Sequence, residues 1–200
     1  MGVVDLTHYY TKDNDRLESE KHPVRFVVKD HPFLMMTDKG VFSKSGLDFG
    51  TRVLLENLTL NANQTVLDLG CGYGPIGIVL AALYQSRVTM VDINQRAVNL
   101  TKENAQIAKV EVEVIQSDGF EKIEGVFDVI VTNPPIRAGK KVIYGWYAES
   151  SKYLSESGTF YLVVNKNQGA PSTITELKRF YSKVEVVCKK SGYHLISCQK

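Results

Sequence analysis

From Thr65 onward, short runs of β-branched residues alternate with stretches of helical periodicity, and this alternation constrains the fold more than any other feature of the chain. The pattern predicts strands at 65–69, 88–92, 111–115, 127–132, 158–164, 184–188 and 193–198, and helices at 75–86, 94–109, 140–156 and 172–181. Only residues 189–192 separate the last two strands, which is too short for a parallel crossover. The sequence therefore predicts an α/β fold: a seven-stranded, mostly parallel sheet with its last strand antiparallel and helices on both faces.

The segments before this sheet predict a hairpin at 24–28 and 33–37, and an amphipathic helix at 47–60. Within the sheet region, Pro75 suits the first turn of its helix, and Ser172 is predicted to be the N-cap of the last one. No repeat, low-complexity stretch or linker interrupts the chain, and 44% hydrophobic with 23% charged residues is ordinary globular composition. We expect one domain, with residues 1–60 as an N-terminal extension packed on a core of residues 61–200.

Composition also bounds the class of protein. Cys71, Cys188 and Cys198 form no CxxC pair, so we expect reduced thiols and no metal site. No apolar run approaches the roughly 20 residues that span a bilayer, and residues 1–20 are polar and mixed in charge. We therefore expect a cytoplasmic protein without membrane association. The histidines are too scattered to form a ligand set and are expected at surface or packing positions: His8, His22, His31 and His194.

The charge of the chain is unevenly distributed. Residues 1–128 hold 13 Lys+Arg against 18 Asp+Glu, whereas residues 129–200 hold 11 against 4, a local charge of +7. A surface that faces nucleic acid shows such an asymmetry, and solvated lysines on exposed helices give the same count.

A glycine-rich turn follows the first core strand. Gly72, Gly74 and Gly77 satisfy G-x-G-x-x-G between a strand and a helix, and Asp92 lies twenty residues beyond Gly72. Glycines let the backbone approach a ligand, and a helix start favours negative charge. Asp92 could accept hydrogen bonds from ribose hydroxyls, either of NAD or of S-adenosylmethionine (SAM). The alternative role for Asp92 is a helix N-cap.

A third acidic residue, Asp118, ends the next strand together with Gly119 and Phe120. Its carboxylate could accept from an adenine amino group while Phe120 or Ile93 covers a ring face. The alternative is that Asp118 and Gly119 only form a turn.

Asn133, Pro134, Pro135 and Ile136 directly follow the strand at 127–132. The carboxyl end of a sheet strand is where α/β folds bind ligands. An amide side chain and a carbonyl with no competing amide proton form two acceptors that could hold an exocyclic NH2 group. The alternative is a strand-ending turn, because proline cannot donate to a ladder.

Basic residues lie immediately beyond this motif. Arg137, Lys140 and Lys141 are followed by no acid before Glu149, so they could hold a phosphate backbone beside the site. A second polar loop, residues 165–171, should open on the same edge with Lys166 and Gln168 as substrate contacts; the alternative is that these are solvated loop residues.

Taken together, the glycine turn after Asp68, the residues 91–94, Asp118 and the motif 133–136 resemble the SAM-dependent methyltransferases of the small-domain type. The likeness is closest to the RsmC-like ribosomal RNA guanine-N2 methyltransferases and covers roughly residues 33–198. It includes a segment before the first core strand, residues 40–43 and 47–51.

The resemblance implies a role for each group of residues. Asn133, Pro134, Pro135 and Ile136 would form the catalytic motif, with Asn133 and the Pro134 carbonyl binding the target amine. Asp68 would serve the methionine end of SAM, and Asp92 the ribose. The remaining cofactor contacts would be Asp48, Thr51, Gly70, Cys71, Gly72, Gly74, Ile93, Asp118, Gly119 and Phe120.

The implied activity is transfer of a methyl group from SAM to an exocyclic amine of RNA, namely guanine N2 of ribosomal RNA. The same grip suits adenine N6, cytosine N4 or a protein glutamine, and an NAD-dependent oxidoreductase and a non-catalytic RNA-binding module remain alternatives. Ile136 replaces an aromatic residue that many relatives carry, so stacking on the target base would fall to Trp146, Tyr144 or Phe42. RsmC-like proteins often carry an additional N-terminal half, whereas only residues 1–64 precede the first core strand here. We expect a monomer or a homodimer, with the second copy or the ribosomal particle supplying the missing recognition surface.

Overall fold

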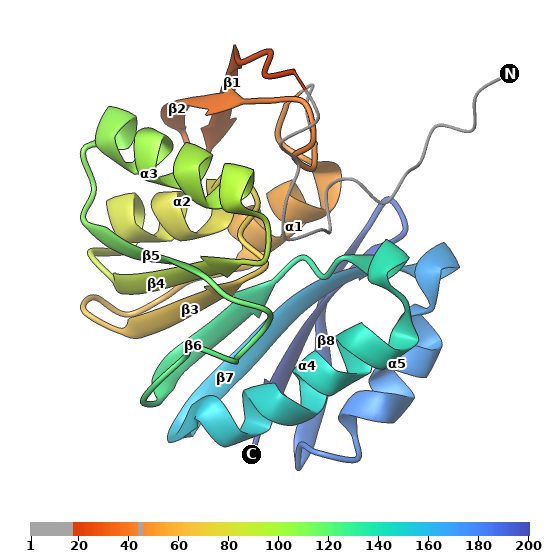
Figure 1. The fold of residues 1–200 in the computed structure, drawn as a ribbon. Helices are drawn as coiled ribbons and strands as arrows, with labels where there is room; N and C mark the ends of the chain where they lie inside the picture. Colours follow the sequence, from red (N-terminus) through yellow and green to blue (C-terminus); the bar gives the residue numbers. More distant parts are fainter. Residues whose placement is uncertain (1–17, 44–45) are drawn as a thin grey trace, which may run out of the picture.

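The structure is a computed structural model that describes residues 18–43 and 46–200; His8 and most of the polar N-terminal segment lie outside the described residues. A two-stranded antiparallel hairpin comes first, followed by a helix and then a seven-stranded sheet with four further helices (Figure 1). The hairpin consists of β1 (His22–Val28) and β2 (His31–Thr37), and the helix after it is α1 (Phe49–Asn57). Both predicted hairpin strands are confirmed, and the helix is shorter than predicted.

The large sheet has the order β5-β4-β3-β6-β7-β9-β8. β9 is antiparallel to both of its neighbours and all other pairs are parallel, so the predicted topology is confirmed. The strands are β3 (Thr65–Leu69), β4 (Arg87–Asp92), β5 (Val112–Gln116), β6 (Phe127–Thr132), β7 (Leu154–Asn165), β8 (Lys183–Lys190) and β9 (Tyr193–Gln199). The helices are α2 (Pro75–Tyr84), α3 (Gln95–Ala108), α4 (Lys140–Tyr153) and α5 (Ala170–Leu177), with short 3-10 turns η1 (Ile136–Ala138) and η2 (Lys166–Gln168).

Helices cover both faces of the sheet (Figure 1). Successive residues of β3 point to opposite faces: Val66 packs in a cluster with α1, α2 and α3, and Leu67 in a second cluster with α4 and α5. Because both faces are buried, the central strands are continuous apolar runs rather than alternating ones. This explains why the carboxyl edge of the sheet, rather than either face, is open to ligands.

The two C-terminal helices differ from their predicted bounds, and the last of them ends at Leu177 rather than at residue 181. The predicted helix 140–156 ends at Tyr153, because Leu154 pairs with Phe127 and begins β7. The last helix begins at Ala170 rather than at Ser172, because Gly169 in the left-handed conformation is its N-cap and Pro171 fits its first turn. Ser172 lies inside this helix, and its hydroxyl donates to the Gly169 carbonyl at 2.9 Å.

A buried side chain of α3, Asn104, hydrogen-bonds to the N-terminal hairpin. The Asn104 amide accepts from the Met36 N–H at 2.6 Å and donates to the Met36 carbonyl at 2.8 Å, which pairs it with the backbone of β2. Beyond β2, Arg96 reaches Asp38 and Asn94 donates to the Gly40 carbonyl at 3.2 Å. These contacts hold the loop after β2 beside the carboxyl ends of β3 and β4.

Within the described part of the chain, no helix is long and apolar enough to cross a membrane. The three cysteines are free. No cluster of three or more His, Cys, Asp or Glu side chains in the same part of the chain could hold a metal ion.

Candidate active site at the carboxyl edge of the sheet

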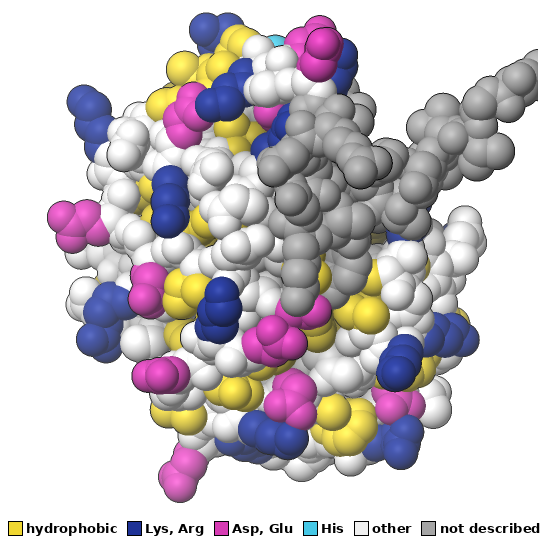
Figure 2. All heavy atoms as spheres, in the orientation of Figure 1, with side chains coloured by type: hydrophobic (Ala, Val, Ile, Leu, Met, Phe, Trp, Pro, Cys, Tyr) yellow, Lys and Arg dark blue, Asp and Glu magenta, His cyan; other side chains and the backbone are white. Residues whose placement is uncertain are grey.

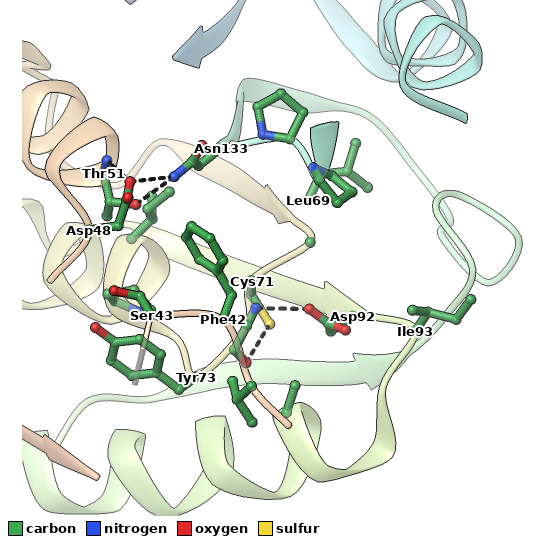
Figure 3. Close-up of a pocket in the computed structure, with 18 of the residues that line it drawn as sticks. Phe42, Ser43, Asp48, Thr51, Leu69, Cys71, Tyr73, Asp92, Ile93 and Asn133 are labelled. Carbon is green, nitrogen blue, oxygen red and sulfur yellow. Dashed lines mark hydrogen bonds between the residues drawn. The ribbon is translucent and has the colours of Figure 1, made fainter. Parts of the chain in front are cut away.

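A cavity of about 440 Å³ opens at the carboxyl ends of β3, β4 and β6 (Figure 3). Its size is in the range of small-molecule sites, which are about 300–1,000 Å³. Segments far apart in the sequence form its wall. It is lined by residues 41–43, Asp48, Thr51, residues 69–73, Pro75, Ile76, residues 91–93, Ala97, Ser117, Gly119, residues 133–137, Trp146, Gln168 and Tyr193.

The glycine loop forms one side of the cavity. The N–H groups of Gly70 and Cys71 both donate to the Val91 carbonyl at 2.9 Å, so the chain turns sharply where β3 ends. Gly70 and Gly72 have φ of 74° and 60°, which residues with a Cβ rarely adopt. Gly74 is the left-handed N-cap of α2 and does not line the cavity.

Asp68 lies beneath this loop, fully buried and outside the cavity lining. Its Oδ2 accepts from the Gly77 N–H, in the first turn of α2, at 2.8 Å. Its Oδ1 has no partner among the described residues. Burial, reinforced by the nearby charge of Asp92, raises the pKa of Asp68 to about 7, although the Gly77 hydrogen bond opposes this. An unused acceptor on a buried acid suits a cationic group.

Asp92 faces the cavity from the end of β4. Its two oxygens accept from the N–H groups of Gly72 and Asn94, both at 2.9 Å (Figure 3 shows the first of these). The N-cap of α3 is Asn94, so the N-cap alternative for Asp92 is wrong. Burial raises the pKa of Asp92 to about 6. Each carboxylate oxygen can still accept a further hydrogen bond from a ligand hydroxyl.

The segment after β5 contributes differently from the prediction. Ser117 and Gly119 line the cavity, whereas the Asp118 side chain and Phe120 do not. The Asp118 carbonyl accepts from Glu121 N–H in a turn, and Phe120 stacks on Tyr153 with ring centroids 4.7 Å apart.

Trp146 of α4 supplies the aromatic wall instead. A Cβ on Gly70 would lie 3.0 Å from its ring, and one on Gly119 2.8 Å from its Nε1. The indole therefore lies against two glycine backbones at the cavity wall. Tyr144, the neighbouring candidate for stacking, lies outside the lining.

Asn133 directly follows β6 and faces the start of α1. Its Nδ2 donates to Asp48 Oδ2 at 2.8 Å and to Thr51 Oγ1 at 3.0 Å (Figure 3). Asp48 is the N-cap of α1 and also accepts from the Thr51 N–H at 3.0 Å. Because a carboxylate only accepts, the amide atom beside it must be the nitrogen. Both amide hydrogens are thereby used, and the Oδ1 of Asn133 receives no hydrogen bond from the described residues.

Three further aromatics line the cavity, namely Phe42, Tyr73 and Tyr193. Phe42 is 45% exposed at the loop after β2. Tyr193 begins β9 and packs on Phe49, with ring centroids 5.7 Å apart. A Cβ on Gly50 would lie 2.8 Å from the Tyr193 ring, so a glycine is needed where α1 meets this ring. No sequence motif marks Tyr193, because its place at the cavity depends on the insertion of β9 next to β7.

The basic residues after β6 and β7 divide into two groups. Arg137 and Gln168 line the cavity. Lys140, Lys141 and Lys166 are exposed outside it, at the beginning of α4 and in η2. The structure thus brings most of the predicted motif residues to one cavity, and places Asp68, Gly74, Asp118, Phe120 and these three lysines outside its lining.

The fold and this site together define a Rossmann-like methyltransferase. The chain belongs to the methyltransferase small domain family, whose sequence profile matches residues 32–197. The expected fold is confirmed, and so is SAM as the expected cofactor.

The chain is similar to two relatives in sequence and to one solved structure in fold. An uncharacterised protein of Bacillus subtilis, YbxB, is 41% identical and covers 96% of this chain and 98% of its own length. Ribosomal RNA small subunit methyltransferase C of Shewanella denitrificans is 32% identical over 80% of this chain and 47% of its own length. The 16S rRNA N2 G1207 methyltransferase of T. thermophilus, solved with AdoMet and guanosine, has a TM-score of 0.84 and 24% identity, covering 92% of this chain and 52% of that one. The chain therefore spans about half the length of these ribosomal RNA methyltransferases.

Proposed function

We propose that the chain transfers the methyl group of SAM to an exocyclic amine of RNA, specifically N2 of a guanine in ribosomal RNA. The observation that carries the proposal is the orientation of the Asn133 amide. Its nitrogen is held by Asp48 and Thr51, at 2.8 and 3.0 Å, which leaves its oxygen as an acceptor at the cavity. An NH2 group is the complementary donor.

The residues around the glycine loop fit SAM better than a dinucleotide. A pyrophosphate would bind the free backbone N–H groups at the N-terminus of α2. One of these groups, the Gly77 N–H, already donates to the Asp68 carboxylate. The unpartnered Asp68 Oδ1 suits the ammonium of a methionine group, directly or through water. Asp92 would accept from the ribose hydroxyls, and Trp146 would flank the adenine. When bound, SAM supplies an activated methyl group.

The catalytic work of the protein would be to orient the amine. The exocyclic nitrogen of guanine is a poor nucleophile, because its lone pair is delocalised into the ring. Acceptance of its two N–H groups by Asn133 Oδ1 and the Pro134 carbonyl would favour a more pyramidal, electron-rich nitrogen. The charge of Asp48 behind the amide strengthens this acceptor. Alignment and exclusion of water would then carry much of the acceleration, without a strong general base.

The choice of RNA is supported by the local charge of +7 in residues 129–200 and by the named activities of the relatives. A ribosomal substrate would also place the chain in the cytoplasm. Adenine N6, cytosine N4 and a protein glutamine offer the same NH2 group to Asn133, so the substrate must be identified by experiment.

The experiment is to incubate the protein and labelled SAM with separate undermodified small and large ribosomal subunits, free ribosomal RNA and a protein extract. Mass spectrometry of the nuclease digest then identifies the labelled product. We expect N2-methylguanosine from a ribosomal substrate. Label in another nucleoside or in protein would overturn the guanine assignment, and absence of label in every fraction would overturn the enzymatic one.

A further inference from the structure

Nine of the eleven basic side chains of residues 129–200 fall into two sets, and Lys178 and Lys200 belong to neither. At the amino ends of the strands, Lys152, Arg179 and Lys183 pair with Glu149, Glu176 and Glu185 at 2.6–2.8 Å. At the carboxyl ends, six basic residues have no acidic partner among the described residues. We call these six the basic track: Arg137, Lys140, Lys141, Lys166, Lys189 and Lys190.

The sheet topology brings the distant members of the basic track together. The backbone of Lys166 donates to the Gly192 carbonyl at 2.7 Å, so η2 is joined to the turn between β8 and β9. Ser191 and Gly192, with φ of 47° and 85°, form a tight two-residue turn that fixes the end of β8. Burial lowers the pKa of His194, and the nearby charges of Lys189 and Lys166 lower it further, so both lysines lie near this ring.

The basic track begins at the active-site cavity. Arg137 is part of the cavity wall. At the other end, Asn165, Tyr193 and Lys190 form one row across β7, β9 and β8. Residues directly opposite in neighbouring strands project to the same face, so Lys190 lies beside Tyr193, which also lines the cavity. Unpaired cations therefore flank the cavity on both sides of its opening.

Away from the basic track, charge is mixed, since Lys21 pairs with Glu103, Lys39 with Glu20 and Arg96 with Asp38. Over α3 and β5, on the face shown in Figure 2, basic and acidic side chains are interspersed, which does not favour a polyanion. Lysines on an edge strand can also serve to prevent pairing with another sheet. Edge protection is the alternative role for Lys189 and Lys190 on β8, which also exposes Val186 and Val187. It does not explain Arg137, nor the lysines of α4 and η2.

We propose that the basic track is the docking surface for the phosphodiester backbone of the RNA, with the strand crossing from the start of α4 over η2 to the β8–β9 turn. The proposal rests on the proposed function for the identity of the polymer. It adds a recognition surface formed by Lys189 and Lys190, which lie more than 50 residues from the catalytic motif in sequence.

The test compares two triple variants of equal charge. The track variant carries Lys166→Gln, Lys189→Gln and Lys190→Gln. The control carries Lys152→Gln, Lys178→Gln and Lys183→Gln. These residues lie toward the amino ends of the strands, away from the basic track. Each lowers the formal net charge from +2 by three. Binding of an unmodified small-subunit ribosomal RNA transcript is measured by filter retention over a series of KCl concentrations, without SAM.

We expect the track variant to lose about tenfold or more in affinity, and the slope of log affinity against log salt to fall by about two, the value for three phosphate contacts on single-stranded RNA. The control should stay within about twofold of wild type. Equal losses of RNA affinity in both variants would overturn the proposal, and so would unchanged RNA affinity in the track variant. New self-association of that variant would then show that the lysines prevent pairing of edge strands. Polyglutamate serves as a second ligand. If the wild type binds it as tightly as RNA, and the track variant loses both affinities equally, the partner is an acidic protein instead. Because SAM is absent, the result is independent of whether wild type transfers a methyl group.

Discussion

The side-chain amide of Asn133 donates to the carboxylate of Asp48 at 2.8 Å, although 85 residues separate them in sequence. This hydrogen bond joins the segment after β6, residues 133–136, to the N-cap of α1. It decides which way the amide faces, since exchange of its oxygen and nitrogen would place two acceptors against each other. The N-terminal extension therefore does more than pack on the core, because it orients the group proposed to hold the target amine.

Asp48→Asn should lower kcat, because the variant loses the charged acceptor for Asn133. A weaker affinity for SAM in the same variant would show that Asp48 also contacts the cofactor. Loss of one orienting hydrogen bond, about 0.5–1.5 kcal/mol, corresponds to roughly two- to tenfold in rate. Thr51→Val should act in the same direction, and Thr51→Ser should restore the rate because it keeps the Oγ1 acceptor. Steady-state kinetics with calorimetry for SAM measure both effects. Equal rates for the valine and serine variants would show that Thr51 does not orient the amide.

Asp92→Ala should weaken SAM binding by roughly 1.5–3 kcal/mol, the scale of hydrogen bonds to a charged group. The variant also leaves the N–H groups of Gly72 and Asn94 without their acceptor. Asp92→Asn retains one acceptor oxygen and should fall between the two. Isothermal titration of SAM checks the order of the three proteins, and an affinity of Asp92→Ala equal to wild type would remove the ribose assignment.

Stability should depend on pH through Asp68. Its folded pKa of about 7 lies above the ordinary value of 3.8. Between these pH values the folded chain binds more protons than the unfolded chain, so the free energy of unfolding should fall as pH rises, by at most roughly 1.4 kcal/mol per pH unit for this group. Asp92, with a folded pKa of about 6, adds to the fall at the lower end.

Urea unfolding at pH 5 and pH 8 tests this for wild type and Asp68→Asn. The variant keeps an oxygen for the Gly77 N–H and removes the titration, so it should lose less stability between the two pH values. Identical losses in both proteins would show that the buried carboxyl group does not titrate in this window.

A matched pair of glycine substitutions tests the contact between α1 and β9. Gly50→Ala would place a Cβ 2.8 Å from the Tyr193 ring and 3.0 Å from Asp48 Oδ2, so we expect a loss of about 1–3 kcal/mol in stability and a lower kcat. Gly145→Ala in α4 meets no atom within 4 Å, and should gain about 0.5–1 kcal/mol. Thermal unfolding compares the two, and a neutral Gly50→Ala would show that Tyr193 can move aside.

The sheet and the ends of its strands could be predicted, because apolar runs and glycine turns are local signals. Asp92 and Asn133 were found in this way, as residues that follow buried strands. The sequence predicts Trp146 only as a candidate for stacking on the target base, because its position against Gly70 depends on how α4 is rotated against the sheet. The place of Tyr193 at the cavity could not be predicted, because it depends on the order of the strands in the sheet. The bond from Asn133 to Asp48 is a contact between two elements, and neither element carries a signal for the other.

The most direct test of the account is Asn133→Ala, measured for both SAM affinity and methyl transfer. Calorimetry should give a SAM affinity near wild type, since the Asn133 amide is proposed to contact the target amine and the cofactor site retains its other residues. The initial rate of label transfer to undermodified ribosomal subunits should fall by about 100-fold or more, the scale for loss of one preorganised polar group in an active site. A variant that binds SAM normally and transfers at the wild-type rate would contradict the account, and so would one that loses both properties equally.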